Sequence, residues 1–329
     1  YAGDIAAEQV PKRTTGQPRA RVVHGHFGHN AHSQPMGHIC GDDIRINGFQ
    51  HDVGVQAALG ETLAEITPGE LRHTFFASAG CEAVEGALKT ARIASGKPVI
   101  ISTDASFHGK TFGALSASGR EKYKKPFEPL LPGFEQIPYG DADALEARLK
   151  KKDVGAFICE CIQGEGGVNP ARREFLELAR YLCDKYDTLL IFDEVQTGIG
   201  RTGAMFAFQN FGVTPDILAL AKGLGGGFPI GATIINDKVA QTFHYGDHAS
   251  TFGGNPLATA VANAVLEEIE KILPRIKEVG GFLEDCLKKK ISPLDNVLEI
   301  RGIGLIYGID VKTNARDICE RCIKEGLLV

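Results

Sequence analysis

From about residue 53 onward the apolar positions follow two alternating patterns. Apolar residues at helical spacing predict helices over residues 53–66, 81–95 and 173–186. Short apolar runs between turn residues predict strands, and these runs are RHTFFA, PVIIS, GAFICE, LLIFDE, DILALA and GATIIND. Strands that alternate with helices are typical of an α/β fold, so we predict a mainly parallel, doubly wound sheet.

The same pattern suggests three parts in the chain. Residues 1–52 are rich in Gly, His, Arg and Gln with little periodicity, so we predict an irregular N-terminal segment. Residues 53–255 carry the sheet pattern and form the predicted large domain. After residue 256 two helical stretches, LATAVANAVLEEIEKIL and IKEVGGFLEDCLKKKI, precede a strand GIGLIYGIDV, which predicts a smaller C-terminal α+β domain over 256–329.

Composition narrows the classes of function. The 329 residues carry a formal net charge of −5, which provides no electrostatic attraction to nucleic acid or to an anionic membrane. No apolar run is long enough to span a bilayer, and the first forty residues lack the apolar centre of a signal peptide. We therefore expect a cytoplasmic protein with no nucleic-acid or membrane partner.

Cysteines and histidines offer two weak metal motifs. The eight cysteines are scattered, which fits reduced thiols better than a disulfide framework. Cys319 and Cys322 form a lone CxxC whose spacing repeats one face of a helix, so metal or redox use is the lesser alternative. The histidines of segment 24–38 match no standard metal spacing, and we expect a solvated or interface loop and no metal site.

Two charged residues close strand-like runs. Asp193 ends LLIFD and Lys222 follows DILALA, so both belong at the carboxyl edge of the sheet, where open α/β folds bind ligands. Pyridoxal phosphate (PLP) needs a lysine for a Schiff base and a carboxylate for its ring nitrogen. We expect Asp193 to be buried, with the ring nitrogen or a structural arginine as its partner. Lys222 is either a desolvated nucleophile or a surface lysine.

Small-residue turns supply candidate phosphate sites. The turn SAGCEA leads from a strand into a helix, where the first N–H groups, those of Gly80 and Cys81, suit an anion. Ser250 and Thr251 stand beside glycines and suit phosphate as well. In the loop ASFHGKTFG, Phe107 could stack on a planar ring or simply pack within the loop.

A dinucleotide motif is also present. The residues GIGRTG at 198–203 match GxGxxG, but DEVQT separates them from the preceding strand. No clear helix and no suitably spaced acidic residue follow them. An NAD-dependent oxidoreductase therefore remains a distant alternative.

Taken together, the motifs resemble those of the class III PLP-dependent aminotransferases of fold type I. The resemblance covers about residues 60 to 270 and rests on FFASAGCEAVEGALK, SFHGKTFGALSASG, ECIQGEGGVNP, IFDEVQTGIGRTG, PDILALAKGLGGGFPIGA and STFGGNPLA. It implies a PLP-dependent homodimer with its active site at the interface, with a smaller C-terminal domain. In comparison with typical members we expect this domain to be shortened.

The resemblance also implies residue roles. Lys222 is the implied Schiff-base lysine and proton carrier, and Asp193 the implied partner of the ring nitrogen. The remaining implied cofactor contacts are Gly80 and Cys81 at the phosphate, Phe107 with its neighbour His108 and Val195 around the ring, Gln196 at the phenolic oxygen, and Thr251 from the partner subunit. Cys81 replaces the family's usual threonine, so it offers an N–H but no hydroxyl.

Substrate roles are implied for four further residues. Glu165 and Arg301 resemble a switching pair, in which the arginine turns from the glutamate to the carboxylate of 2-oxoglutarate. Glu160 resembles a wall of the same pocket. Lys110 stands where amino-acid-directed members carry arginine, and its point charge favours a diamine over a carboxylate-bearing donor.

The amine donor stays open at this stage. KGLGGGFPIGA, GGVNP and DHASTFGGNPLA resemble the acetylornithine and ornithine aminotransferases, whereas HGKTFGALSA and KKPFEPLLPGF resemble the putrescine members. We expect transfer of a terminal amino group from putrescine, acetylornithine or ornithine to 2-oxoglutarate, giving glutamate. The first alternative is a dimeric protein that binds PLP but is catalytically impaired.

Overall fold

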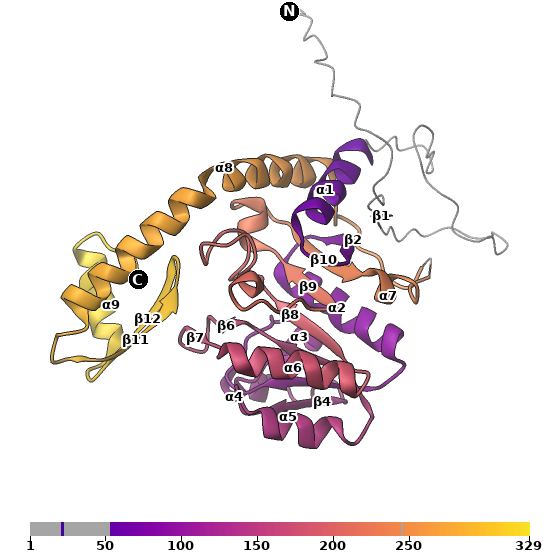
Figure 1. The fold of residues 1–329 in the computed structure, drawn as a ribbon, viewed down its shortest axis with the longest axis horizontal. Coiled ribbons are helices and arrows are strands. Elements are labelled where there is room, and N and C mark those ends of the chain that lie inside the picture. The colour runs from indigo at the N-terminus through magenta and orange to yellow at the C-terminus, as the bar shows by residue number, and fades with distance from the viewer. Residues whose placement is uncertain (1–20, 23–52, 245) are drawn as a thin grey trace, which may run out of the picture.

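The computed structural model describes residues 21–22, 53–244 and 246–329, and its centre is an eight-stranded sheet (Figure 1). In sheet order the strands are β1 (Arg21–Val22), β2 (Leu71–Ala77), β10 (Gly231–Asn236), β9 (Ile217–Leu220), β8 (Leu189–Asp193), β5 (Val154–Cys159), β3 (Val99–Thr103) and β4 (Phe134–Ile137). Only β10 runs antiparallel to its neighbours, which confirms a mainly parallel sheet. The carboxyl ends of the other strands therefore share one edge.

The central strands are buried on both faces, which explains their continuous apolar sequences. In β8, Leu190 and Phe192 belong to one core cluster, whereas Leu189 and Ile191 belong to the other. Since successive strand residues point to opposite faces, each cluster covers one face of the sheet. One face carries α2 (Gly80–Ser95), and the other carries α1 (Val53–Ile66), α5 (Ala142–Leu149) and α6 (Arg173–Lys185).

The C-terminal region differs from the prediction in two ways. The two expected helices form one helix, α8 (Pro256–Cys286), which continues through Pro274. A proline removes one helical hydrogen bond, but the Leu, Glu, Lys and Arg residues on either side are strong helix formers. The single expected strand is a hairpin of β11 (Val297–Ile303) and β12 (Ile306–Val311), because Gly304 adopts a φ of +63° and allows the chain to reverse.

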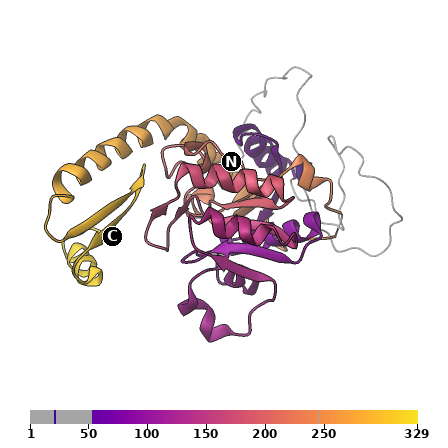
Figure 2. The ribbon, with the colours of Figure 1, turned by 60° about the horizontal axis from the view of Figure 1, so that its bottom comes forward.

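Helix α8 leads from the main sheet to the β11–β12 hairpin and to α9 (Ala315–Lys324), as two views show (Figures 1 and 2). The domain boundary at residue 256 coincides with the start of this helix but stays a prediction. Besides β1, β4 and α5, the short elements not predicted from the pattern are α3 (Phe112–Ala117), α4 (Glu121–Lys124), η1 (Lys125–Phe127), β6 (Ile162–Gln163), β7 (Asn169–Pro170), η2 (Ala207–Asn210), η3 (Lys222–Gly225), α7 (Asp237–Ala240) and the π-helix η4 (Leu287–Ile291).

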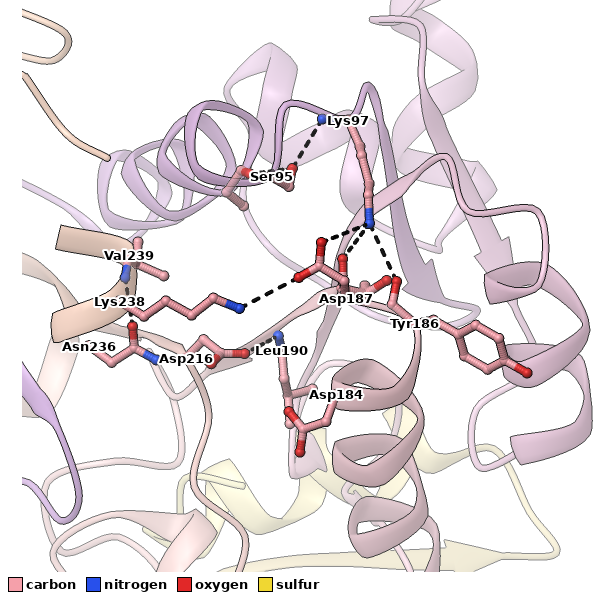
Figure 3. A network of polar contacts seen from close by, with 12 residues as sticks. Ser95, Lys97, Asp184, Tyr186, Asp187, Leu190, Asp216, Asn236, Lys238 and Val239 are labelled. Carbon is pink, nitrogen blue, oxygen red and sulfur yellow. Dashed lines mark hydrogen bonds and ion pairs between the residues drawn. The ribbon is translucent and has the colours of Figure 1, made fainter. Parts of the chain in front are cut away.

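Polar contacts tie the opposite edge of the sheet together, where β8 begins (Figure 3). Asp216 accepts hydrogen bonds from the backbone N–H of Leu190 (2.8 Å) and from Nδ2 of Asn236 (2.9 Å). The Asp187 carboxylate lies 3.6 Å from Nζ of Lys97 and 3.5 Å from Nζ of Lys238. This edge is therefore occupied by structural contacts, and the carboxyl edge is left for chemistry.

Two absences hold for the described part of the chain. Within it, no helix combines the length and apolarity needed to cross a membrane. The same residues contain no cluster of three or more His, Cys, Asp or Glu side chains that could hold a metal, and their cysteines are all free. The histidines of segment 24–38 lie outside the described residues.

Candidate active site

The loops at the carboxyl edge carry nearly every candidate residue. Five strands that run in the same direction supply them. β2 is followed by Gly80 and Cys81, β3 by Phe107, His108 and Lys110, and β5 by Glu160 and Glu165. Asp193 is the last residue of β8, which is followed by Val195 and Gln196, and β9 is followed by Lys222. Because neighbouring parallel strands end at one edge, residues far apart in the sequence can meet there.

The amino end of α2 forms the centre of this edge. A Cβ atom built on Gly80 would lie 2.7 Å from Cγ1 of Val195 and 3.5 Å from Cβ of Ala221, so only glycine allows this approach. In the same way a Cβ on Gly109 would lie 2.8 Å from that of Cys81. No side chain caps α2, which leaves its amino end suited to an anion.

Asp193 is buried next to a histidine. Its Oδ2 lies 2.8 Å from Nδ1 of His108, and its Oδ1 accepts a hydrogen bond from the N–H of Val195 (3.0 Å). The side chain that pairs with Asp193 is thus a histidine, where the sequence suggested a ring nitrogen or a structural arginine. Burial lowers the pKa of His108, but the hydrogen bond and charge of Asp193 outweigh it and leave that pKa raised. The buried Nε2 of His108 has no hydrogen-bond partner among the described residues.

Glu160 joins the loops that follow β3 and β5. It is buried, and it accepts hydrogen bonds from the N–H groups of Phe107 and Gly164, both at 3.2 Å. Burial raises the pKa of Glu160 to about 7, with the charge of His108 acting in the opposite direction. The carboxyl group can therefore change its charge near neutral pH.

Lys222 differs from the expectation of a desolvated side chain. The structure leaves it exposed at the first position of η3, one residue after Ala221, which lies beside Gly80. Its backbone has a φ of +43°, a conformation that is uncommon for residues other than glycine. Strain of this kind is concentrated at functional sites, and here it places a lysine at the amino end of α2.

Phe107 and Lys110 pack against Tyr123, a residue that no sequence signal singled out. The Phe107 and Tyr123 rings meet edge to face with centroids 5.7 Å apart. Nζ of Lys110 lies 3.5 Å from the Tyr123 centroid and 5.8 Å from that of Phe107. The exposed lysine therefore makes a cation–π contact at the rim of the site.

The expected pair of Glu165 and Arg301 does not form. The Glu165 carboxylate instead lies 3.7 Å from Nη1 of Arg120. Arg301 contacts Glu299, Asp310 and two carbonyl groups of the loop that carries Glu165. Gln196 is close to this loop, because a Cβ on Gly164 would lie 1.5 Å from its Oε1.

Thr251 lies in a hollow whose lining does not include Asp193. With Ser250 and His248 it lines this hollow of about 240 Å³ beside Glu82 and Glu85 of α2. Its expected role in the site of a partner subunit stays a prediction.

The GIGRTG motif forms turns, and a 3₁₀ helix begins only at Ala207. No helix starts where a pyrophosphate would need it, so this segment lacks the geometry of a dinucleotide site. Glu194, four residues before this motif, is buried and accepts hydrogen bonds from the N–H groups of Ala207 and Phe208, both at 2.7 Å. Burial raises its pKa to about 8. The sequence pattern did not predict these hydrogen bonds of Glu194, although Glu194 directly follows Asp193.

Known proteins are similar to this chain in sequence and in fold. The family model described as Aminotransferase class-III matches residues 42–329. The acetylornithine aminotransferase of Aquifex aeolicus (strain VF5) is 45% identical over 260 residues, which are 78% of this chain and 68% of that protein. The corresponding enzyme of Bacillus subtilis (strain 168) is 44% identical over 286 residues, covering 86% of this chain and 73% of that protein.

A solved structure extends the similarity to the fold. The ornithine aminotransferase from Toxoplasma gondii, which has PLP at partial occupancy in its active site, superposes with a TM-score of 0.80. It is 36% identical in sequence, and the match covers 86% of this chain and 70% of that one.

Proposed function

We propose that this chain, which belongs to the class III aminotransferases, moves the terminal amino group of a diamine or diamino acid to 2-oxoglutarate. Its family makes it a PLP-dependent transaminase that takes an amino group from a donor and passes it to a keto acid. We propose the roles of the individual residues, the amine donor and the keto-acid acceptor below.

One observation carries the assignment. The buried pair of Asp193 and His108 lies in the same loop cluster as the amino end of α2 and the strained backbone of Lys222. These residues fit PLP, because the cofactor needs a lysine, a carboxylate for its ring nitrogen and an anion site for its phosphate. The close approach of Val195 to Gly80 supports this fit, since the valine side chain lies beside the phosphate end of the site.

Bound PLP supplies a carbonyl carbon that accepts amino groups and a ring that withdraws electrons. Asp193 would stabilise a positive charge at the ring nitrogen, and His108 would hold its carboxylate in place. The N–H groups of Gly80 and Cys81 would bind the phosphate. Val195 and Phe107 would exclude water from the two ring faces, and Gln196 would hydrogen-bond the phenolic oxygen. Lys222 would carry the proton, because its amine can release and accept one.

The donor is proposed from the relatives and from Lys110. The curated relatives named above are acetylornithine aminotransferases, and the solved structure is an ornithine aminotransferase. Acetylornithine, ornithine and putrescine all present a terminal amine. Lys110 offers a donor carboxylate only a point charge, and its Nζ already lies over the ring of Tyr123. Both features favour a diamine, which has no carboxylate to bind. Glu160 and Glu165 would face the substrate from the loop after β5.

The proposed assembly is a homodimer in which Thr251 of one subunit completes the phosphate site of the other. The position of Thr251 in a hollow beside α2, whose lining does not include Asp193, supports this arrangement.

The test is the visible absorbance of the purified protein with PLP, before and after borohydride. Lys222→Ala is expected to remove the band of lysine-bound cofactor and to lower transamination by at least about a thousandfold. Lys238→Ala is the matched control, because Lys238 lies at the opposite edge of the sheet (Figure 3).

An unchanged band in Lys222→Ala would contradict the assignment of the lysine. A band in the wild-type protein that no amine donor bleaches would favour a cofactor-binding but impaired protein.

A further inference from the structure

All five N–H groups of the Arg301 guanidinium have partners within the chain. Nη1 donates to Glu299 and Asp310, both at 2.6 Å, and Nη2 donates to Asp310 at 3.1 Å. The other bonds reach the loop after β5: Nη2 donates to the carbonyl of Gly167 (2.9 Å) and Nε to that of Val168 (3.4 Å). An arginine has five donors, so this side chain has none left for a substrate in the described conformation.

The loop that Arg301 holds is strained. Residues 164–168 form the tip of the β6–β7 hairpin, where Gly167 has a φ of +114° and Val168 a φ of +54°. A β-branched residue with positive φ is an outlier that persists only where its surroundings hold it. The two carbonyls bound by Arg301 belong to these two residues.

The β11–β12 hairpin meets a second loop as well. The N–H of Leu305, in its turn, donates to the carbonyl of Arg201 (2.9 Å). A Cβ on Gly304 would lie 2.4 Å from the carbonyl carbon of Thr202, so the backbones are in direct contact. Figure 1 shows the hairpin beside β6 and β7. Strands β5 and β8 are neighbours, and one hairpin therefore touches the loops that follow both.

These contacts lead toward the active site. Glu165 lies in the strained tip, and Gln196 lies over Gly164 at its base. Gly308 of β12 also touches the tip, since a Cβ there would lie 2.6 Å from the carbonyl oxygen of Gly167. Displacing the tip would therefore move Glu165 and release the contact that restrains Gln196.

We propose that Arg301 is a positioning residue, through which the β11–β12 hairpin holds the 164–168 tip, and with it Glu165 and Gln196, at the carboxyl edge of the sheet. Glu299 and Asp310 orient the guanidinium from the two strands of the hairpin. The consequence for substrate binding rests on the proposed function, but the consequence for the loop does not. This role replaces direct binding of a substrate carboxylate by Arg301.

The first test is hydrogen–deuterium exchange of the purified protein incubated with PLP, followed over peptides that contain residues 163–170. Arg301→Gln is expected to accelerate exchange there about tenfold, because charge-assisted bonds to the tip are lost. Gly308→Ala keeps the arginine but presses on Gly167, and it is expected to act in the same direction. Arg316→Gln in α9 and Gly281→Ala in α8 are matched controls, since Arg316 is exposed and a Cβ on Gly281 meets nothing within 4 Å.

The second test is steady-state kinetics of the same variants with PLP. Arg301→Gln and Gly308→Ala are both expected to raise KM about tenfold for every donor, including one without a carboxylate, with a smaller change in kcat. A higher KM for carboxylate substrates alone, with unchanged exchange and a normal Gly308→Ala variant, would overturn the positioning role. If the wild-type protein transaminates nothing, the proposed function fails, while the exchange experiment still decides the role of Arg301.

Discussion

Nδ1 of His108 lies 2.8 Å from Oδ2 of Asp193, and the two residues are only 3% and 5% exposed. His108 comes from the loop after β3 and Asp193 is the last residue of β8, and these two strands are not adjacent in the sheet. A buried carboxylate is costly without a partner. The hydrogen bond with the histidine therefore orients the Asp193 carboxylate before any ligand arrives.

His108→Ala is expected to weaken PLP binding by about tenfold to a hundredfold, because Asp193 loses its charge-assisted hydrogen bond. The measurement is a PLP titration followed by visible absorbance, together with circular dichroism to verify the fold. His244→Ala is the control, since that side chain is 81% exposed. Equal PLP affinities for the two variants would show that His108 does not support Asp193.

The raised pKa of Glu160 predicts a dependence of stability on pH. An acid whose pKa rises from 4.5 to about 7 on folding binds more protons when folded, so stability falls as pH rises between these values. The loss from this group is about 3 kcal/mol across that range. Urea unfolding of the PLP-free protein at several pH values measures it. Glu160→Gln should make the free energy of unfolding less dependent on pH in this range. A pH dependence identical to that of the wild type would show that Glu160 is not its source.

Lys110→Arg is expected to shift donor preference toward carboxylate-bearing amines. An arginine can bind a carboxylate with two hydrogen bonds, so the kcat/KM ratio of ornithine to putrescine should rise about tenfold. Lys122→Arg is the control, because Nζ of Lys122 also lies over Tyr123, 4.9 Å from its centroid. A ratio that stays constant in Lys110→Arg would remove Lys110 from donor selection.

Asp216→Ala tests the polar contacts at the opposite edge of the sheet (Figure 3). The change removes acceptors for Leu190, Asn236 and the largely buried Arg180, whose Nη1 lies 2.9 Å from Asp216. We expect a loss of about 2–4 kcal/mol in the free energy of unfolding, with unchanged PLP affinity in the folded protein.

Asp184→Ala removes the other, exposed partner of Arg180, at 2.6 Å, and should cost less than about 1 kcal/mol. Equal losses of stability in Asp216→Ala and Asp184→Ala would show that the burial of Asp216 does not make its contacts more stabilising.

Much of the large domain could be predicted from its local pattern. The six predicted strands and the helices of residues 53–66, 81–95 and 173–186 are present because burial on a helix face or within a sheet leaves a periodic trace. The short strand β4 and helix α5 were missed, since such brief segments carry little periodicity. The two wrong predictions in the C-terminal region arose at Pro274 and Gly304. A proline can end a helix or lie within it, and a glycine can continue a strand or form a turn, so packing decides in each case.

For the site, the sequence by itself determined which residue types stand at the ends of the strands, and hence the chemistry available at one edge. Only the tertiary structure decided their partners. His108 meets Asp193 across 85 positions of the sequence, and Arg301 meets Gly167 across 134. The tertiary structure also left the side chain of Lys222 exposed. The physical reason is that side-chain periodicity reports burial within each element, whereas long-range partners depend on strand order and on how the hairpin packs against the loops.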